Sequence, residues 1–160
     1  MSVTRTVIRW GLVAAGVFAA AAQLIRPDRT NPPVNAAQRV DAHLAVPADV
    51  QAIFDRSCRD CHSHDTRWPA YSQVAPISWL VAHDVNEGRE EMNLSDWGRY
   101  DRDEAREKLK DICKEVRGGH MPVRSYTWMH PGAKLSSAEV ERLCAWTEQQ
   151  RSTPMETLGR

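Results

Sequence analysis

The five-residue motif Cys58-Arg59-Asp60-Cys61-His62 constrains this chain more than any other feature of its sequence. Two cysteines separated by two residues and followed at once by histidine form the C-x-x-C-H pattern of covalent c-type haem attachment. On a helical turn the two thiols lie about as far apart as the two haem vinyl groups to which they add. The motif therefore predicts one covalent haem c, with Cys58 and Cys61 as thioether anchors and His62 as an axial iron ligand.

Two other chemistries use closely spaced cysteines. A thioredoxin-like dithiol requires a βαβ context, which the sequence lacks because it has no alternating strand pattern of useful length. A structural zinc site requires a second pair of ligands at metal spacing. Neither requirement is met, so the sequence favours haem.

The sixth iron ligand is less constrained by the sequence. Met121 follows Gly118 and Gly119 at the end of an expected helix and precedes Pro122, so the chain turns there and then stays extended. A thioether suits haem iron and raises its reduction potential. We expect Met121 to be this ligand, while a bis-histidine site and an open iron position remain alternatives. The other candidates are His64, His83, Met92, His120 and His130.

The N-terminal segment has the character of an export sequence. Arg5 and Arg9 precede an uncharged apolar run that ends at Ile25. The 19 residues from Val7 to Ile25 give roughly 28 Å of helix, just enough to cross a bilayer. The alanines at 20–22 also form a cleavage pattern, so both an uncleaved anchor and a cleaved signal are possible. Either one places the rest of the chain outside the cytoplasm, on the periplasmic side of a bacterial inner membrane.

The remaining chain divides into three parts. Residues 26–46 contain three prolines and no helical apolar stripe, which predicts a linker. Residues 47–150 form the expected haem-binding domain, and residues 151–160 form a C-terminal tail. The part after residue 25 carries a net charge of only −2, without a basic face, so we expect no nucleic-acid partner.

The expected fold of the domain is all-α, a small cytochrome c-like set of helices around one haem. Apolar positions predict a first helix over 47–58 and a second that begins near Pro76 and weakens at Gly88. Asp101 and Ser136, each followed three residues later by glutamate, predict the starts of two more helices. Long loops are expected at 62–75 and 118–135, and loops of this length usually carry function.

Two cysteines remain after haem attachment. Cys113 and Cys144 each lie on the apolar stripe of a predicted helix, in a chain expected to reach an oxidising compartment. A disulfide between the third and last of these helices is therefore expected, and two buried free thiols are the alternative. The disulfide would be structural.

At these residues the chain resembles class I cytochromes c, through the attachment motif after an N-terminal helix and the Met121-Pro122 pair before a final helix. More narrowly, it resembles a bacterial haem-binding domain family over roughly residues 47–148. The matching segments are CHS at 61–63, TRWPAYS at 66–72, APISWL at 75–80, HDVNEGR at 83–89, NLSDW at 93–97, Met121-Pro122 with Tyr126, and HPGAKLS at 130–136, ending near Trp146. The resemblance implies a single haem and an N-terminal membrane segment, but no particular reaction. Ala70 departs from the family, which commonly has a second tryptophan there.

Several further side chains are candidates for contact with the haem. Aromatic side chains that could border it are Trp68, Trp79, Trp97 and Tyr126, for which core packing is equally expected. Polar side chains that could bind its propionates are Arg67, Arg89 and Asn93, for which a solvated surface role is the favoured alternative.

These features predict an electron carrier whose iron keeps both axial ligands and passes single electrons to unidentified redox partner proteins. Two other classes remain open. A peroxidase-type enzyme needs an open iron position and a distal base such as His120 or His64. A haem-based redox or gas sensor would exchange the Met121 ligand, although the chain shows no separate output domain.

Overall fold

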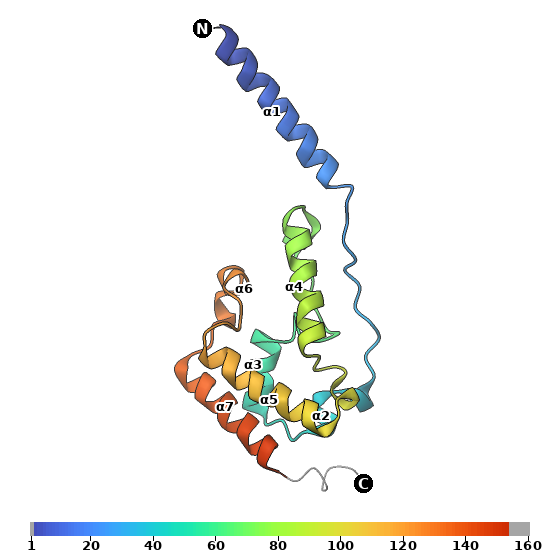
Figure 1. Ribbon diagram of the computed structural model, residues 1–160, viewed down its shortest axis with the longest axis vertical. Coiled ribbons are helices and arrows are strands. Elements are labelled where there is room, and N and C mark those ends of the chain that lie inside the picture. Colours follow the sequence, from blue (N-terminus) through green and yellow to red (C-terminus); the bar gives the residue numbers. More distant parts are fainter. Residues whose placement is uncertain (1, 154–160) are drawn as a thin grey trace.

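The computed structural model describes residues 2–153, and over this range the chain is all-helical. The C-terminal tail expected from residue 151 lies outside the described residues from 154 onward. Figure 1 shows one long helix projecting from a small helical domain. The seven α-helices within residues 2–153 are α1 (Ser2–Ala22), α2 (Val40–His43), α3 (Ala48–Ser57), α4 (Ile77–Glu91), α5 (Arg102–Arg117), α6 (Arg124–Met129) and α7 (Ser137–Ser152).

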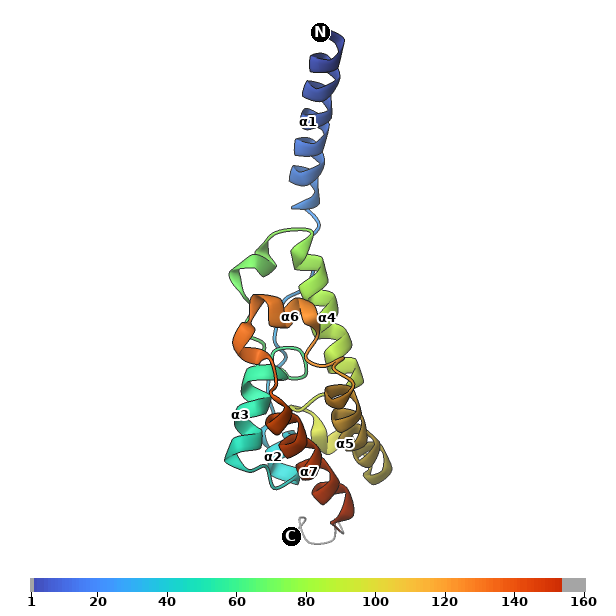
Figure 2. The same ribbon diagram turned by 90° about the vertical axis from the view of Figure 1, so that its left-hand side faces the viewer.

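Helix α1 stands apart from the domain. Its stretch Thr4–Ala22 is long and apolar enough to cross a membrane, with a mean hydropathy of 1.3 and none of its surface buried against the rest of the chain. In Figures 1 and 2 it leaves the domain next to the N-terminal end of α4, while α5, α7 and the C-terminus extend toward the opposite end. The apolar N-terminal helix expected from the sequence is therefore present.

The segment after α1 is bound to the domain instead of forming a free spacer. The side chain of Gln23 makes two hydrogen bonds to the backbone of Ala75, at 3.0 and 3.3 Å. The indole N–H of Trp79 donates to the carbonyl of Ile25 at 2.8 Å. Arg29 donates to the carbonyl of Ser72. Polar side chains thus hold residues 23–29 against the loop before α4 and against the start of that helix.

The hydrophobic core begins before residue 47, where the sequence placed the start of the domain. Val40 of α2 and Leu44, the residue that follows this helix, are almost fully buried and belong to the core cluster. The backbone N–H of Val40 also donates to the carbonyl of Leu94 at 2.8 Å. A four-residue helix is too short to show a periodic stripe, so its contribution to the core was missed.

Helices α3, α5 and α7 supply most of the core. Phe54 of α3 and Trp146 of α7 are fully buried and meet edge to face, with ring centroids 5.4 Å apart. Leu109 of α5 and Leu143 of α7 are also buried in this cluster. Phe54, Leu109 and Leu143 lie on the apolar stripes that predict these helices, whereas Trp146 lies outside the predicted stripe of the last helix. Burial of one stripe per helix holds an amphipathic bundle together.

The helix ends follow the predicted capping patterns. The side chain of Asp101 accepts hydrogen bonds from two backbone N–H groups in the first turn of α5. Ser136 and Glu139 form a complete capping box at the start of α7. The expected loop at 118–135 contains α6, a six-residue helix whose first turn has no side-chain cap.

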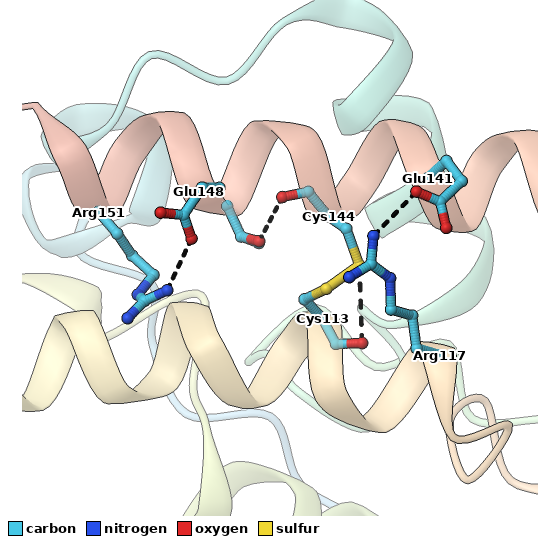
Figure 3. Close-up of a disulfide and its surroundings, with 7 residues drawn as sticks. Cys113, Arg117, Glu141, Cys144, Glu148 and Arg151 are labelled. Carbon is cyan, nitrogen blue, oxygen red and sulfur yellow. Dashed lines mark hydrogen bonds and ion pairs between the residues drawn. A yellow bond between two sulfur atoms is a disulfide. The ribbon is translucent and has the colours of Figure 1, made fainter.

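A disulfide joins α5 to α7, as the sequence predicts. Cys113 and Cys144 are bonded, with their Cα atoms 4.8 Å apart. Figure 3 shows the disulfide between the two helices, and the ion pair of Arg117 with Glu141 beside it bridges them again at 2.9 Å. Exposed ion pairs contribute little, so the covalent bond dominates this connection.

Candidate functional site

The C-x-x-C-H motif forms a tight turn directly after α3. Cys58 caps the helix, and its N–H donates to the carbonyl of Phe54 at 3.0 Å. The N–H groups of Cys61 and His62 then both donate to the carbonyl of Cys58, at 3.2 and 3.0 Å. This turn brings the two thiols and the imidazole to the wall of one cavity, which all three residues line.

The imidazole of His62 is held by its Nδ1 atom. Nδ1 lies 2.7 Å from the carbonyl oxygen of Gly88 and 3.1 Å from that of Met92. Because both partners are acceptors, Nδ1 carries the proton and Nε2 keeps its lone pair. Burial lowers the pKa of His62, which favours the neutral ring. A neutral imidazole with a fixed Nδ1–H and a free Nε2 is the state in which histidine binds a metal ion.

Gly88 lets α4 approach the attachment turn. A Cβ atom at this position would lie 2.7 Å from the carbonyl oxygen of Cys61. The sequence predicts that Gly88 weakens the helix, yet α4 continues through it to Glu91. Glycine lowers the stability of a helix, but this position requires it, because a side chain of any size would collide with the backbone of the turn.

The thiols of Cys58 and Cys61 are free. Burial raises the pKa of each to about 12, so both remain protonated near neutral pH. For Cys61 the nearby carboxylates of Asp84 and Asp60 raise the pKa further. Half-buried, protonated thiols are poor nucleophiles on their own, which argues against an independent thiol-exchange site.

Met121 lines the same cavity as the attachment turn. Helix α5 ends in a turn in which Gly119 has a φ of +70°, and the N–H groups of His120 and Met121 donate to the carbonyl of Glu115 at 3.0 and 3.2 Å. This left-handed glycine reverses the chain and brings Met121 toward the C-x-x-C-H turn. Met121 is 37% exposed.

The five other candidates for the sixth ligand do not line the cavity shared by Cys58, Cys61, His62 and Met121. His64 is buried beside Asn93, whose amide donates to its Nε2 at 2.9 Å. His83 and His120 are exposed and pair with acidic neighbours in sequence. Met92 lines an adjoining cavity together with Cys58, His62 and Met121, and its carbonyl oxygen accepts a hydrogen bond from the His62 ring. His130 lines an adjoining cavity and bonds to Tyr71. Within residues 2–153, Met121 is the candidate that shares the cavity with Cys58, Cys61 and His62.

A polar cluster that sequence reasoning missed closes one side of the turn. Asp60 accepts hydrogen bonds from the hydroxyl of Tyr126 at 2.7 Å and from the guanidinium of Arg67 at 3.1 Å. Burial raises the pKa of Asp60, but these two hydrogen bonds outweigh burial and lower it overall. The ring of Tyr126 stacks on His130 at 4.5 Å. The carboxylate thus ties α6 to the attachment turn, a contact across 66 residues that no local pattern indicates.

The three polar side chains that could bind haem propionates, Arg67, Arg89 and Asn93, already make hydrogen bonds or ion pairs within the protein. Arg67 is paired with Asp60, and Asn93 is buried against His64. Arg89 donates to the carbonyl of Ser63 at 2.8 Å and to the side chain of Asn31 at the same distance. These polar groups hold the chain together around the turn, a role that the sequence did not predict.

Of the four aromatic side chains that could border the haem, one lines the cavity and three lie in other surroundings. Trp97 lies in the core beside Tyr100. Trp68 and Trp79 donate their indole N–H groups to Asn31 and to the carbonyl of Ile25. Of the four, Tyr126 lines the cavity with the attachment turn. Core packing and binding of the N-terminal segment therefore account for the three tryptophans.

Comparison with known families gives one match. A family model described as a haem-binding domain matches residues 17–149, most of the chain. The matched range includes residues 23–46, in agreement with the contacts that bind this segment to the domain. No curated protein and no solved structure matches the chain.

Proposed function

The chain belongs to the haem-binding domain family, and on this premise we propose that it is a c-type cytochrome that carries single electrons outside the cytoplasm. The observation that carries the proposal is the cavity shared by Cys58, Cys61, His62 and Met121. The first three residues supply the complete attachment motif, and the fourth supplies a soft ligand from a distant part of the chain.

The thiols fit covalent attachment. Each S–H group adds across a haem vinyl group to form a thioether, so the reaction needs no leaving group and no external oxidant. Cys58 and Cys61 lie on one turn and face one cavity, as a single haem with two vinyl groups requires. Their attachment to this turn would fix the cofactor next to the imidazole of His62.

The two side chains that would hold the iron come from distant parts of the chain, His62 from the attachment motif and Met121 from the loop after α5. His62 presents Nε2, because two carbonyls hold the proton on Nδ1. These hydrogen bonds also fix the plane of the ring and raise its basicity. Met121 presents a thioether from the loop between α5 and α6. We infer that these two side chains complete the iron coordination, in an arrangement similar to that of class I cytochromes c.

Haem iron with both axial positions filled by protein exchanges one electron between Fe(III) and Fe(II) without binding a substrate. The positions of the two candidate distal bases argue against an enzyme of peroxidase type. His120 is exposed and bonded to Glu115, and His64 is buried outside the cavity. This placement favours electron transfer over catalysis.

We further propose that α1 is an uncleaved membrane anchor. Its 19-residue apolar stretch has the length of a bilayer span. Arg5 and Arg9 lie near the N-terminal end of that stretch, and basic residues mark the cytoplasmic side of a span. The domain would then face the periplasm, where redox partner proteins reach it.

Mass spectrometry tests the covalent attachment. Protein matured in cells that attach c-type haem is expected to carry one added haem mass, and Cys58→Ala/Cys61→Ala is expected to lose it. A matched control is Cys113→Ala/Cys144→Ala, which removes the other two cysteines and should keep the haem. Retention of covalent haem by the Cys58/Cys61 variant would refute the attachment. Rapid binding of cyanide or carbon monoxide by the wild type would instead favour an enzyme or a sensor.

A further inference from the structure

Five exposed apolar side chains gather at one end of the domain, and we call them the apical patch. They are Val74, Ile77, Leu80, Trp128 and Met129. Trp128 is 86% exposed and Met129 is 54% exposed. Ile77 and Leu80 of α4 line one cavity together with Trp128 and Met129 of α6, so the two helices present a shared apolar surface. Exposure of several large apolar side chains together marks an interaction site.

The apical patch lies next to the point where α1 leaves the domain. The hydrogen bonds of Gln23 to Ala75 and of Trp79 to Ile25 tie the end of α1 to the residues around Val74 and Ile77. Figures 1 and 2 both show the N-terminal end of α4 close to the base of α1. Leu24 and Ile25 are exposed as well, so apolar surface continues from α1 toward the patch.

Basic residues flank the apical patch. Arg124 and Lys134 lie on either side of Trp128 and Met129 in sequence, and Arg26 is exposed directly after Ile25. Two acidic residues, Asp60 and Asp84, also line the cavity of the patch, and Asp60 is paired with Arg67. An apolar surface that continues from a helix of membrane-spanning length and is bordered by basic residues is typical of protein that rests on a membrane.

We propose that the apical patch docks on the lipid bilayer, as a second membrane contact in addition to α1. Trp128 occupies the interface between acyl chains and headgroups, where tryptophan is enriched. The contact turns the cavity lined by Cys61, Tyr126 and Trp128 toward the membrane surface. The cofactor site is thereby held at the level of the lipid headgroups instead of moving freely on a tether. This inference rests on the proposed membrane anchor.

Photochemical labelling of the full chain tests the docking. The protein is reconstituted in vesicles of phosphatidylcholine and phosphatidylglycerol, with a phospholipid that carries a diazirine in its acyl chain. After irradiation, reduction and trypsin digestion, lipid adducts are expected on peptides 10–29, 68–89 and 125–134, which hold α1 and the apical patch. Peptide 143–151 of α7, at the far end of the domain, is the internal control and should stay unlabelled.

A charged variant identifies the patch itself. Trp128→Asp/Met129→Asp is expected to lose the adducts on peptide 125–134 while α1 keeps its own. The matched control Ala138→Asp/Ala145→Asp adds two acids at exposed positions of α7 and should leave the labelling unchanged.

Two results would overturn the docking, and they are distinguishable. Adducts on peptide 10–29 without adducts on 125–134 would show an anchored domain that stands away from lipid, or a patch covered by haem or by a partner protein. Absence of adducts on 10–29 would refute the membrane anchor, and the docking with it.

Discussion

The contact between Gly88 and the attachment turn gives a prediction whose sign can be worked out from the structure. We consider Gly88→Ala, which adds one methyl group in α4. That methyl carbon would lie 2.7 Å from the carbonyl oxygen of Cys61 and 3.0 Å from its carbonyl carbon and Cβ. Two of these atoms belong to the backbone, so the contact cannot be relieved by a rotamer change. Helix α4 and the turn must move apart, and the hydrogen bond from His62 to Gly88 must lengthen.

The expected loss of stability is the balance of three effects. Replacing glycine by alanine inside an open helix stabilises a protein by about 1 kcal/mol. Overpacking a close contact costs about 1–3 kcal/mol. Weakening the hydrogen bond to His62 costs up to about 1.5 kcal/mol more. These effects sum to a loss of about 0 to 3.5 kcal/mol, so we expect Gly88→Ala to lower the free energy of unfolding by roughly 2 kcal/mol, where an uncrowded helix would show a gain.

Urea unfolding of the haem-loaded protein, followed by far-UV circular dichroism, measures this change. Gly132→Ala is the matched control, because a Cβ atom there meets no other atom within 4 Å. The control is expected to change the free energy by less than about 0.5 kcal/mol. A Gly88→Ala protein as stable as the wild type, or more stable, would show that α4 does not pack against the turn as described.

Three further changes have expected outcomes. Cys113→Ala/Cys144→Ala opens a loop of 31 residues and should lower the free energy of unfolding by about 3–4 kcal/mol in urea titrations; an unchanged midpoint would contradict this. A hydrogen bond from the backbone N–H of Ser136 and another from Arg56 lower the pKa of Glu139 from its usual 4.5 to about 2. The ionised Glu139 therefore contributes its full share to the free energy of unfolding above pH 4.5, and this contribution is lost as the pH falls toward 2. Glu139→Gln should flatten the stability profile in that window. Arg89→Gln should speed hydrogen exchange at Thr30 and Asn31, to which Arg89 donates hydrogen bonds, whereas Arg99→Gln, at an exposed ion pair, should not.

Local patterns in the sequence predict the parts of the fold that depend on local physics. The apolar stripes of α3, α5 and α7 predict these helices because each helix buries one face. The capping residues Asp101 and Ser136 also predict where α5 and α7 begin, because their side chains accept hydrogen bonds from the first N–H groups. The disulfide followed from two cysteines on two such stripes.

The missed features depend on contacts between distant segments. The attachment of residues 23–31 uses polar side chains such as Gln23 and Asn31, whose partners lie 35 or more residues away. Helix α6 has neither a side-chain cap nor a buried residue. From the local sequence, Gly88 predicts only a weakened helix. Its close contact with the backbone of Cys61 depends on the packing of two distant segments, which the local sequence does not contain.

For the candidate site, the C-x-x-C-H motif alone predicts that Cys58, Cys61 and His62 lie together. In the structure these three residues line one cavity, and Met121 lines it as well. The polar cluster of Asp60 and Tyr126 could not be predicted, because an aspartate between two motif cysteines carries no signal of its partner.

The coordination of the iron by His62 and Met121 is the central claim, and the absorption spectrum of the ferric protein tests it most directly. We predict the red charge-transfer band of methionine-ligated low-spin haem in the wild type and its loss in Met121→Ala, while His120→Ala, at an exposed position outside the cavity, keeps the band. Absence of the band from the wild type, or its survival in Met121→Ala, would contradict the account.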